Sequence, residues 1–127
     1  MILDTNILLR LIDGGGSPRY DEVRARLESA LELGERLVVT AATIHEVVFV
    51  LRSTATGYGY SRTETAGEIH ELLDAPELRV EHADALRSAA TDFGAHQSID
   101  FHDFYLAARA RTLDEKVYSL DRDFRRM

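Results

Sequence analysis

The sequence predicts an α/β domain in which a parallel sheet is covered by helices on both faces. Short apolar runs of strand length alternate with longer segments whose apolar residues recur at helical spacing. This alternation continues to the end of the chain and is typical of parallel sheets, because each parallel connection crosses over through a helix. The 127 residues, of which 45% are hydrophobic, are enough for one packed domain, which we expect to span residues 1–127.

The segment 1–60 is predicted to form two strands and three helices. The strands are short apolar runs, and the helices show apolar residues three or four positions apart. In order along the chain, these elements are a strand at 1–3, a helix at 7–12, a helix at 20–31, a strand at 37–39 and a helix at 44–51. The three consecutive glycines within 13–18 lack the spacing of a phosphate-binding loop, so we interpret this segment as a connection.

The segment 61–127 continues the alternation. Ser61 and Glu64 have the spacing of a capping box, which indicates the start of a helix that runs to Leu73. The remaining elements are a weak strand at 78–80, a helix at 83–93, a helix at 104–111 and a last strand at 117–120. The pattern therefore predicts four parallel strands.

Composition and charge exclude several classes of function. The net charge of −7 argues against a protein that coats nucleic acid through a broad basic surface, but it is compatible with a nuclease whose cations offset a cluster of carboxylates. The absence of cysteine excludes disulfides, thiolate metal sites and a cysteine nucleophile. There is no secretory signal pattern, and the longest apolar run, Val47 to Leu51, is far below the roughly 20 residues of a membrane span. We therefore expect a cytoplasmic protein without a membrane partner.

Four acidic residues stand where an α/β sheet usually binds its ligands, beyond the carboxyl ends of the strands. Asp4 directly follows the first predicted strand, and Asp121 directly follows the last. Glu46 lies in the first turns of the helix after the second strand, and Asp103 lies near the start of the helix before the last strand. We expect the four carboxylates to converge and to hold Mg²⁺ or Mn²⁺, which prefer oxygen ligands. Such cations would relieve the repulsion between the acids and support phosphodiester hydrolysis.

The same acids also have a structural interpretation. Acidic residues at helix starts are common caps and interact favourably with the helix dipole. Asp4 and Asp121 can each be an N-cap, and Thr43 with Glu46 fits a capping box. Capping does not require the carboxylates to meet, so convergence separates the two interpretations.

Four segments of the chain, in this order and with these gaps, resemble the PIN-domain family. They are Ile2-Leu3-Asp4-Thr5-Asn6, Glu46 within an apolar helix, Asp103-Phe104-Tyr105-Leu106-Ala107-Ala108 and Ser119-Leu120-Asp121-Arg122-Asp123-Phe124. The similarity extends over the whole chain. It is greatest to the VapC-type ribonuclease toxins of toxin–antitoxin pairs.

The resemblance implies a three-layer α/β/α fold and an Mg²⁺- or Mn²⁺-dependent endoribonuclease that acts on RNA. It also implies a homodimer that is inhibited by an antitoxin protein encoded alongside. The residues that match the family's acidic constellation by position are Asp4, Glu46, Asp103 and Asp121. Asn6 and Ser119 match the polar residues that support this constellation, and Asp123 matches an additional acid.

Two details of the resemblance leave alternatives open. The family pattern continues into a further edge strand, whereas this chain stops at Met127. We therefore expect a sheet of four strands, or one of five strands with the fifth supplied from elsewhere. Asp100 lies close to Asp103 in the sequence. We prefer Asp103 as the acid of the site, because the Ala107-Ala108 pair after it matches the family, and we interpret Asp100 as a cap.

Three further residues are candidates for contact with the substrate. Arg109 and Arg111 lie close together in the sequence and are expected to hold the RNA backbone. His102 directly precedes Asp103 and could contact either the site or the substrate.

Three other functions remain as alternatives. The main one is a catalytically idle PIN-like binding module that acts through a protein partner, which metal binding and turnover would distinguish from an enzyme. A phosphatase of the haloacid-dehalogenase type also opens with an acid after the first strand, but its second aspartate would fall at Asn6, and the only lysine is Lys116. A DNA-directed nuclease of the same family is the third, because no pattern in the sequence distinguishes the two sugars.

Overall fold

The computed structural model describes all 127 residues and contains six α-helices, two β-strands and one 3₁₀ helix. The helices are α1 (Thr5–Asp13), α2 (Pro18–Glu32), α3 (Ala41–Arg52), α4 (Arg62–Asp74), α5 (Ala83–Ala95) and α6 (Phe101–Leu113), and the 3₁₀ helix is η1 (Arg122–Arg125). The strands are β1 (Leu37–Val39) and β2 (Leu78–Val80). All six predicted helices are confirmed. None of them combines the length and the apolar content that a membrane crossing requires.

The sheet is parallel and small. β1 pairs with β2 in parallel, with Leu37 opposite Leu78, and both strands lie where the sequence predicts them. On the other side of β1, Ile2 forms a single parallel bridge to Val38. The amide of Leu3 donates to the Val38 carbonyl at 2.9 Å, and the amide of Val38 donates to the Met1 carbonyl at 2.8 Å. The first predicted strand therefore pairs with β1, but over a single bridge.

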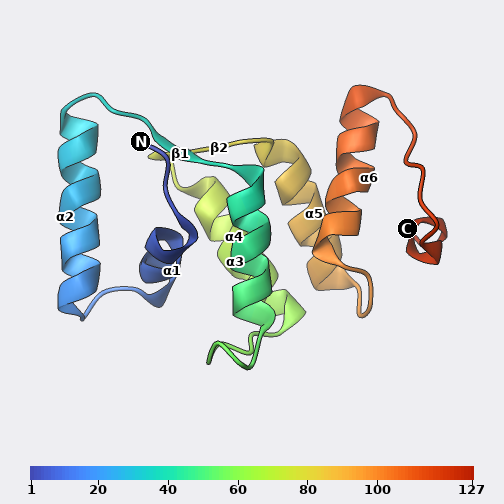
Figure 1. Cartoon of the computed structure of the whole chain (residues 1–127), viewed down its shortest axis with the longest axis horizontal. Coiled ribbons are helices and arrows are strands. Elements are labelled where there is room, and N and C mark those ends of the chain that lie inside the picture. The colour runs from blue at the N-terminus through green and yellow to red at the C-terminus, as the bar shows by residue number, and fades with distance from the viewer.

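The predicted fourth strand at 117–120 is wrong. This segment follows α6 without regular structure and pairs with no strand. Its side chains Tyr118 and Leu120 are 93% and 91% exposed. A short run rich in β-branched and aromatic residues gives a local preference for extended backbone, but a strand also needs an edge with which to pair. Here α6 directs the chain away from residues 1–3 (Figure 1), so the observed sheet has two strands and one bridge in place of four to five strands.

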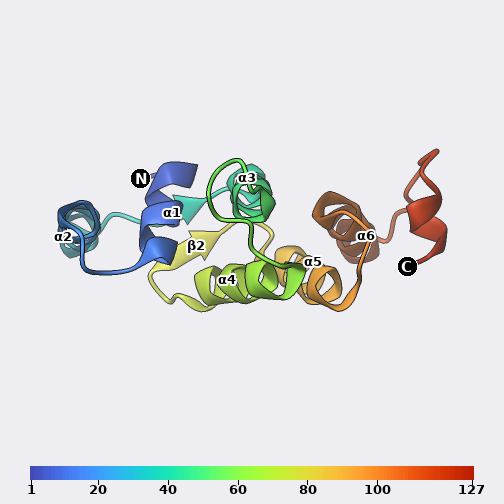
Figure 2. The ribbon, with the colours of Figure 1, turned by 90° about the horizontal axis from the view of Figure 1, so that it is seen from below.

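Helices cover both faces of this sheet. Figure 2 shows α1 and α3 on one side of the strands and α4 on the other. α2 and the residues after α6 lie at opposite ends of the molecule in Figure 1. The core between the layers is closed by fully buried aliphatic side chains, including Leu8, Leu37, Ile44, Leu51, Ile69 and Leu86.

Side-chain caps determine where α1, α2, α3 and α4 begin. The predicted capping box of α4 is confirmed, because the Glu64 amide donates to Ser61 Oγ and the Ser61 amide donates to Glu64 Oε1, both at 3.0 Å. In α3 the cap is Thr40, whose Oγ1 accepts from the Thr43 amide at 3.2 Å. α3 therefore begins one turn earlier than a capping box at Thr43 would require.

Candidate functional site

Asp4 lies at the carboxyl end of the first extended segment and caps α1. Its Oδ1 accepts a hydrogen bond from the Thr5 amide at 2.7 Å, so the capping interpretation of this residue is confirmed. The side chain is exposed, and capping occupies one of its two carboxylate oxygens. Asp4 therefore retains an oxygen that can bind a ligand.

Glu46 is held by α1 and takes no part in a capping box. It lies in the second turn of α3, and its Oε2 accepts a hydrogen bond from Thr5 Oγ1 at 2.7 Å. Thr5 is only 5% exposed, so its hydroxyl fixes the Glu46 carboxylate against the start of α1. We call Asp4 and Glu46 the Asp4–Glu46 pair, because Thr5 bonds to both. The structural alternative for Glu46, a capping box with Thr43, is wrong.

A second group of acids lies at the start of α6. One carboxylate oxygen each from Asp103, Asp121 and Asp123 lies within 4.8 Å of the other two, and we call these residues the acidic triad. Asp103 is in the first turn of α6, whereas Asp121 and Asp123 come from the 14 residues after α6, which we call the C-terminal tail (residues 114–127). The triad therefore contains one residue of α6 and two residues of the tail.

Hydrogen bonds order the tail around the triad. Asp121 caps η1, with its Oδ1 accepting from the Asp123 amide at 2.9 Å, so its capping interpretation is confirmed. Ser119 Oγ accepts from the Asp121 amide at 2.9 Å, so Ser119 lies beside Asp121. The Asp123 carboxylate also forms a salt bridge of 3.0 Å with Arg126.

The triad is a site of unfavourable negative charge. Burial raises the pKa of Asp103, and the nearby carboxylates of Asp121, Asp100 and Asp123 raise it further, whereas His102 lowers it. A carboxylate that is destabilised by like charges is stabilised when a cation binds. The arrangement is therefore suited to a positively charged ligand.

The four predicted acids do not meet at one point. Asp103 and Asp121 come together, with Asp123 as the third member of their cluster, but neither Asp4 nor Glu46 belongs to it. The Asp4–Glu46 pair lies where α1 meets α3, and the triad lies on the other side of α3, at α6 and the tail. The four acids are divided because segment 117–120 does not pair with the sheet. If it paired there, it would bring Asp121 to the sheet edge beside Asp4.

The remaining predicted residues are spread over the molecule. Asn6 lines a pocket together with Arg10 and forms no hydrogen bond to the acids. Arg109 lines a pocket at the start of α5, and Arg111 donates to Ser88 Oγ at 3.2 Å. Both arginines therefore lie towards the far end of α6 from Asp103, and the structure does not place them beside the acids.

Histidines connect α3 to α6. His45 Nε2 and His102 Nδ1 are 3.1 Å apart, and His45 Nδ1 is 2.8 Å from the Ala41 carbonyl. Burial lowers the pKa of His45, the backbone hydrogen bond at Ala41 opposes that shift, and His102 adds to it. A neutral imidazole that bridges the two helices is the form these contacts favour.

A pocket of about 490 Å³ lies between α3 and the start of α6, and the sequence analysis missed it. We call it the α3–α6 pocket. Its polar and exposed aromatic lining comes from His45, Phe49 and Arg52 on α3, from Arg62 on α4, and from Asp100 and His102 at the start of α6. The three α3 residues are spaced i, i+4 and i+7, which places them on one helix face, so this spacing was the available signal.

Glu81 is a second residue that the sequence analysis missed. It directly follows β2, and its Oε1 accepts from the Ala41 amide at the start of α3 at 3.0 Å. The rule that selected Asp4 and Asp121, an acid directly after a predicted strand, would also have selected Glu81. Its carboxylate supports the start of the helix that carries Glu46.

Fold and site together define a small α/β domain with a cluster of carboxylates fit for a divalent cation. A family model described as PIN domain matches residues 1–127, and the chain therefore belongs to the PIN-domain family. PIN domains are generally metal-dependent nucleases, commonly ribonucleases. Comparisons with curated proteins and with solved structures gave no match.

Proposed function

We propose that this protein is an Mg²⁺- or Mn²⁺-dependent endoribonuclease, and that the acidic triad is the centre of its active site. The observation that carries the proposal is the approach of three carboxylate oxygens to within 4.8 Å of one another in a chain of a nuclease family. Structural ion pairs do not account for this cluster, since only Asp123 has a cationic partner. The substrate in this proposal is RNA.

The side chains of the triad fit a hard divalent cation. Mg²⁺ and Mn²⁺ bind carboxylate oxygens and retain several water ligands, so three carboxylates are a sufficient protein contribution. Asp103, Asp121 and Asp123 would hold the ion. When bound, the ion would neutralise the phosphodiester and acidify a water molecule.

The chain's own residues then have separate tasks. Ser119 holds the Asp121 amide and so orients the turn that carries Asp121 and Asp123. The Asp4–Glu46 pair is the second half of the proposed site, and Thr5 holds its Glu46 carboxylate in place. For all four predicted acids to act on one phosphodiester, Asp103 at the start of α6 and Asp121 in the C-terminal tail both have to lie close to the junction of α1 and α3. Asn6 is assigned by family resemblance to support of the acids. Arg109 and Arg111 are assigned to the RNA backbone from their positions in the sequence.

The proposal extends to a biological role. A ribonuclease of the VapC type would be the toxin of a toxin–antitoxin pair in the cytoplasm, would form a homodimer and would be inhibited by its cognate antitoxin protein. We expect expression of the wild-type chain to arrest bacterial growth, and expression of Asp103→Asn not to do so. Growth arrest by both proteins would contradict a toxic ribonuclease activity.

The first experiment compares cleavage by four proteins. Wild type, Asp121→Asn, Asp4→Asn and the exposed control Glu35→Gln are incubated with structured RNA in Mg²⁺, in Mn²⁺ and in EDTA. We expect wild type and control to cleave only with metal, and Asp121→Asn to lose cleavage. Asp121→Asn also serves as the test for contaminating ribonuclease, because a contaminant would cleave RNA equally in both preparations. Equal cleavage by wild type and Asp121→Asn would overturn the proposal.

The Asp4→Asn variant decides the extent of the site. Loss of cleavage in this variant would mean that the Asp4–Glu46 pair and the triad act together. Unchanged cleavage would restrict the active site to the triad and would remove Asp4 from the catalytic residues.

One observation favours a second candidate function, a catalytically idle binding module. The predicted acids are divided between two places, and a PIN domain with a divided site could act through a protein partner alone. Calorimetric titration with Mn²⁺ separates the two functions: we expect binding that Asp121→Asn abolishes if the protein is an enzyme. Absence of both metal binding and turnover would favour the binding module.

A further inference from the structure

The α3–α6 pocket is lined on its α3 side by an exposed aromatic side chain, Phe49. Phe49 is 71% exposed, although phenylalanine is among the residues most often buried. His45 and Arg52 lie on the same face of α3, one turn before and one turn after Phe49. An exposed ring with a guanidinium one turn away is a surface on which a nucleobase can stack beside its phosphate.

The charge of the pocket favours an anionic occupant. Arg52 and Arg62 line it, and neither forms a salt bridge with a carboxylate. Arg52 uses one N–H group to donate to the Tyr60 carbonyl at 2.9 Å, which leaves its other donors free. Asp100 is the only acid that lines the pocket. Two guanidinium groups against one carboxylate leave a net positive charge, which an incoming phosphate would balance.

Arg62 makes one side of the pocket rigid. Its guanidinium lies 3.8 Å from the centroid of the Phe93 ring, and it donates to the carbonyls of Phe93 and Ile99. These contacts tie the end of α5 to the loop before α6. Burial lowers the pKa of Arg62, and the nearby positive charge of Arg52 lowers it further, whereas the carboxylate of Asp100 raises it. The two cations therefore repel each other and are stabilised when an anion binds between them.

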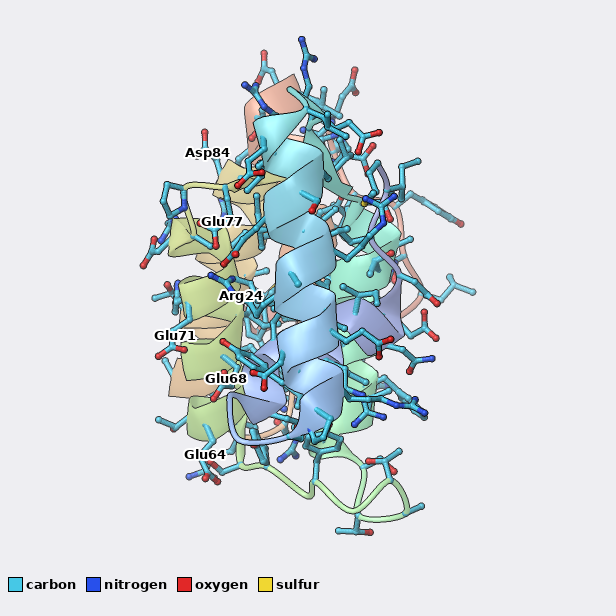
Figure 3. All side chains as sticks on the ribbon, turned by 90° about the vertical axis from the view of Figure 1, so that its left-hand side faces the viewer. Arg24, Glu64, Glu68, Glu71, Glu77 and Asp84 are labelled. Atoms are coloured by element: carbon cyan, nitrogen blue, oxygen red, sulfur yellow. The ribbon has the colours of Figure 1, made fainter.

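The position of the pocket relates it to the acidic triad. Asp100 and His102 line the pocket, and Asp103 of the triad directly follows His102. The opposite charge dominates on α4, where Glu64, Glu68 and Glu71 form a row of acids along the left of Figure 3. A polyanionic substrate would avoid that row, so the pocket is the more favourable approach to the triad.

We propose that the α3–α6 pocket binds one nucleotide of a single-stranded RNA, with its phosphate on Arg52 and its base against Phe49. The identity of the ligand as RNA rests on the proposed ribonuclease function. The pocket volume of about 490 Å³ is within the usual range for a small-molecule site and can accommodate a nucleotide. This assignment replaces the α6 arginines with residues of α3 as the main RNA contacts near the acids.

The test measures RNA binding separately from cleavage. Fluorescence anisotropy of a fluorescein-labelled single-stranded RNA is recorded in EDTA, over a range of salt concentrations. Arg52→Ala is expected to raise Kd about tenfold and to reduce the salt slope by about 0.7, because one phosphate contact is lost. Phe49→Ala is expected to raise Kd about tenfold with an unchanged salt slope, because only stacking is lost.

Arg36→Ala is the matched control. Arg36 is exposed in the loop before β1, and its side chain takes part in no hydrogen bond or salt bridge, so its removal makes the same change in net charge far from the pocket. We expect RNA binding by this variant to match wild type. Circular dichroism and thermal unfolding verify that each variant is folded, and the exposed position of Phe49 protects that variant from loss of the core.

Several results would overturn the proposal. Equal weakening by Arg52→Ala and Arg36→Ala would show that only overall charge matters, and wild-type affinity in Phe49→Ala would exclude stacking. If both pocket variants bind RNA normally but fail to bind an antitoxin protein, the pocket is a protein-docking surface. If wild type cleaves RNA with metal but Arg52→Ala and Phe49→Ala bind and cleave RNA as well as wild type, the pocket proposal is overturned and the proposed nuclease function stands. Pocket-dependent RNA binding without metal-dependent cleavage would overturn the proposed nuclease alone.

Discussion

Asp103 is the residue at which burial and like charge act together. Its pKa is raised first by burial and then by Asp121, Asp100 and Asp123. Because the folded-state pKa lies above the value in the unfolded chain, the folded protein binds more protons between these two values. The stability contributed by protonated Asp103 is therefore present at acidic pH and is lost as the pH rises through the raised pKa.

Removal of this carboxyl group should stabilise the metal-free protein at neutral pH. We expect Asp103→Asn to raise Tm in EDTA by roughly a few degrees at most, since water screens a partly exposed cluster. Below the ordinary pKa of aspartate, the variant and wild type should unfold at the same temperature. Thermal unfolding at the two pH values measures the effect, with Glu35→Gln as control. A lower Tm for Asp103→Asn at neutral pH would contradict the interpretation.

The single elements of this chain were largely predictable, whereas their mutual placement was not. All six helices and the two strands of the sheet were identified by apolar spacing, by short apolar runs and, for α4, by the capping box at Ser61, because that information is local to each segment. Segment 117–120 carries the same kind of local pattern, but the structure offers it no strand edge. Because this segment does not pair with the sheet, Asp121 lies away from Asp4. A single missing strand pairing therefore divides the predicted site.

The helix caps show that contacts between residues close in the sequence were predictable, whereas contacts between distant residues were not. Ser61 and Glu64 could be paired from the sequence because they are three residues apart and no other box competes. At α3, both Thr40 and Thr43 can cap a helix, and the chain uses the residue directly after β1. Glu46 was consequently free to contact Thr5, 41 residues earlier, a contact for which the sequence holds no local signal.

The Thr5–Glu46 hydrogen bond joins α1 to α3, and its removal should affect both stability and the site. Thr5→Val keeps the shape of the buried side chain but loses the donor, so we expect a loss of about 1 kcal/mol in the free energy of unfolding. If Glu46 is part of the active site, RNA cleavage should fall about tenfold or more, as is usual when a residue that orients a ligand is lost.

Thr5→Ser provides the matched comparison, because it keeps the hydroxyl and loses only a buried methyl group. This variant should lose about 0.8 kcal/mol of stability and retain most of the cleavage activity. Denaturant unfolding and cleavage rates, measured on the same preparations, separate the two effects. Equal activity of the valine and serine variants would mean that the hydrogen bond does not orient a functional group.

The Asp4–Glu46 pair and the acidic triad lie on opposite sides of α3. A metal ion held by the triad should therefore stabilise the folded protein through α6 and the C-terminal tail. A ligand that binds only the folded state contributes about 2.7 kcal/mol at a concentration of 100 times Kd. We expect Mn²⁺ or Mg²⁺ to raise Tm of the wild type and EDTA to reverse the effect.

The variant Asp121→Asn identifies the source of this stabilisation. It removes one member of the acidic triad and leaves the Asp4–Glu46 pair intact, so the Tm increase with metal should disappear. An increase that persists in Asp121→Asn and disappears in Asp4→Asn would place the ion at the junction of α1 and α3.

The position of Lys116 has a practical consequence for work on this protein. It is the only lysine, and it is exposed in the C-terminal tail between the end of α6 and the last eleven residues. A lysine-specific protease therefore has a single cleavage site, and one cut releases the peptide 117–127 with Asp121 and Asp123, while Asp103 stays with the helical body. Proteolysis in the presence and absence of metal thus reports directly whether the tail is held in place, and the truncated product is a nearly complete protein from which two of the three clustered acids have been removed without any mutation.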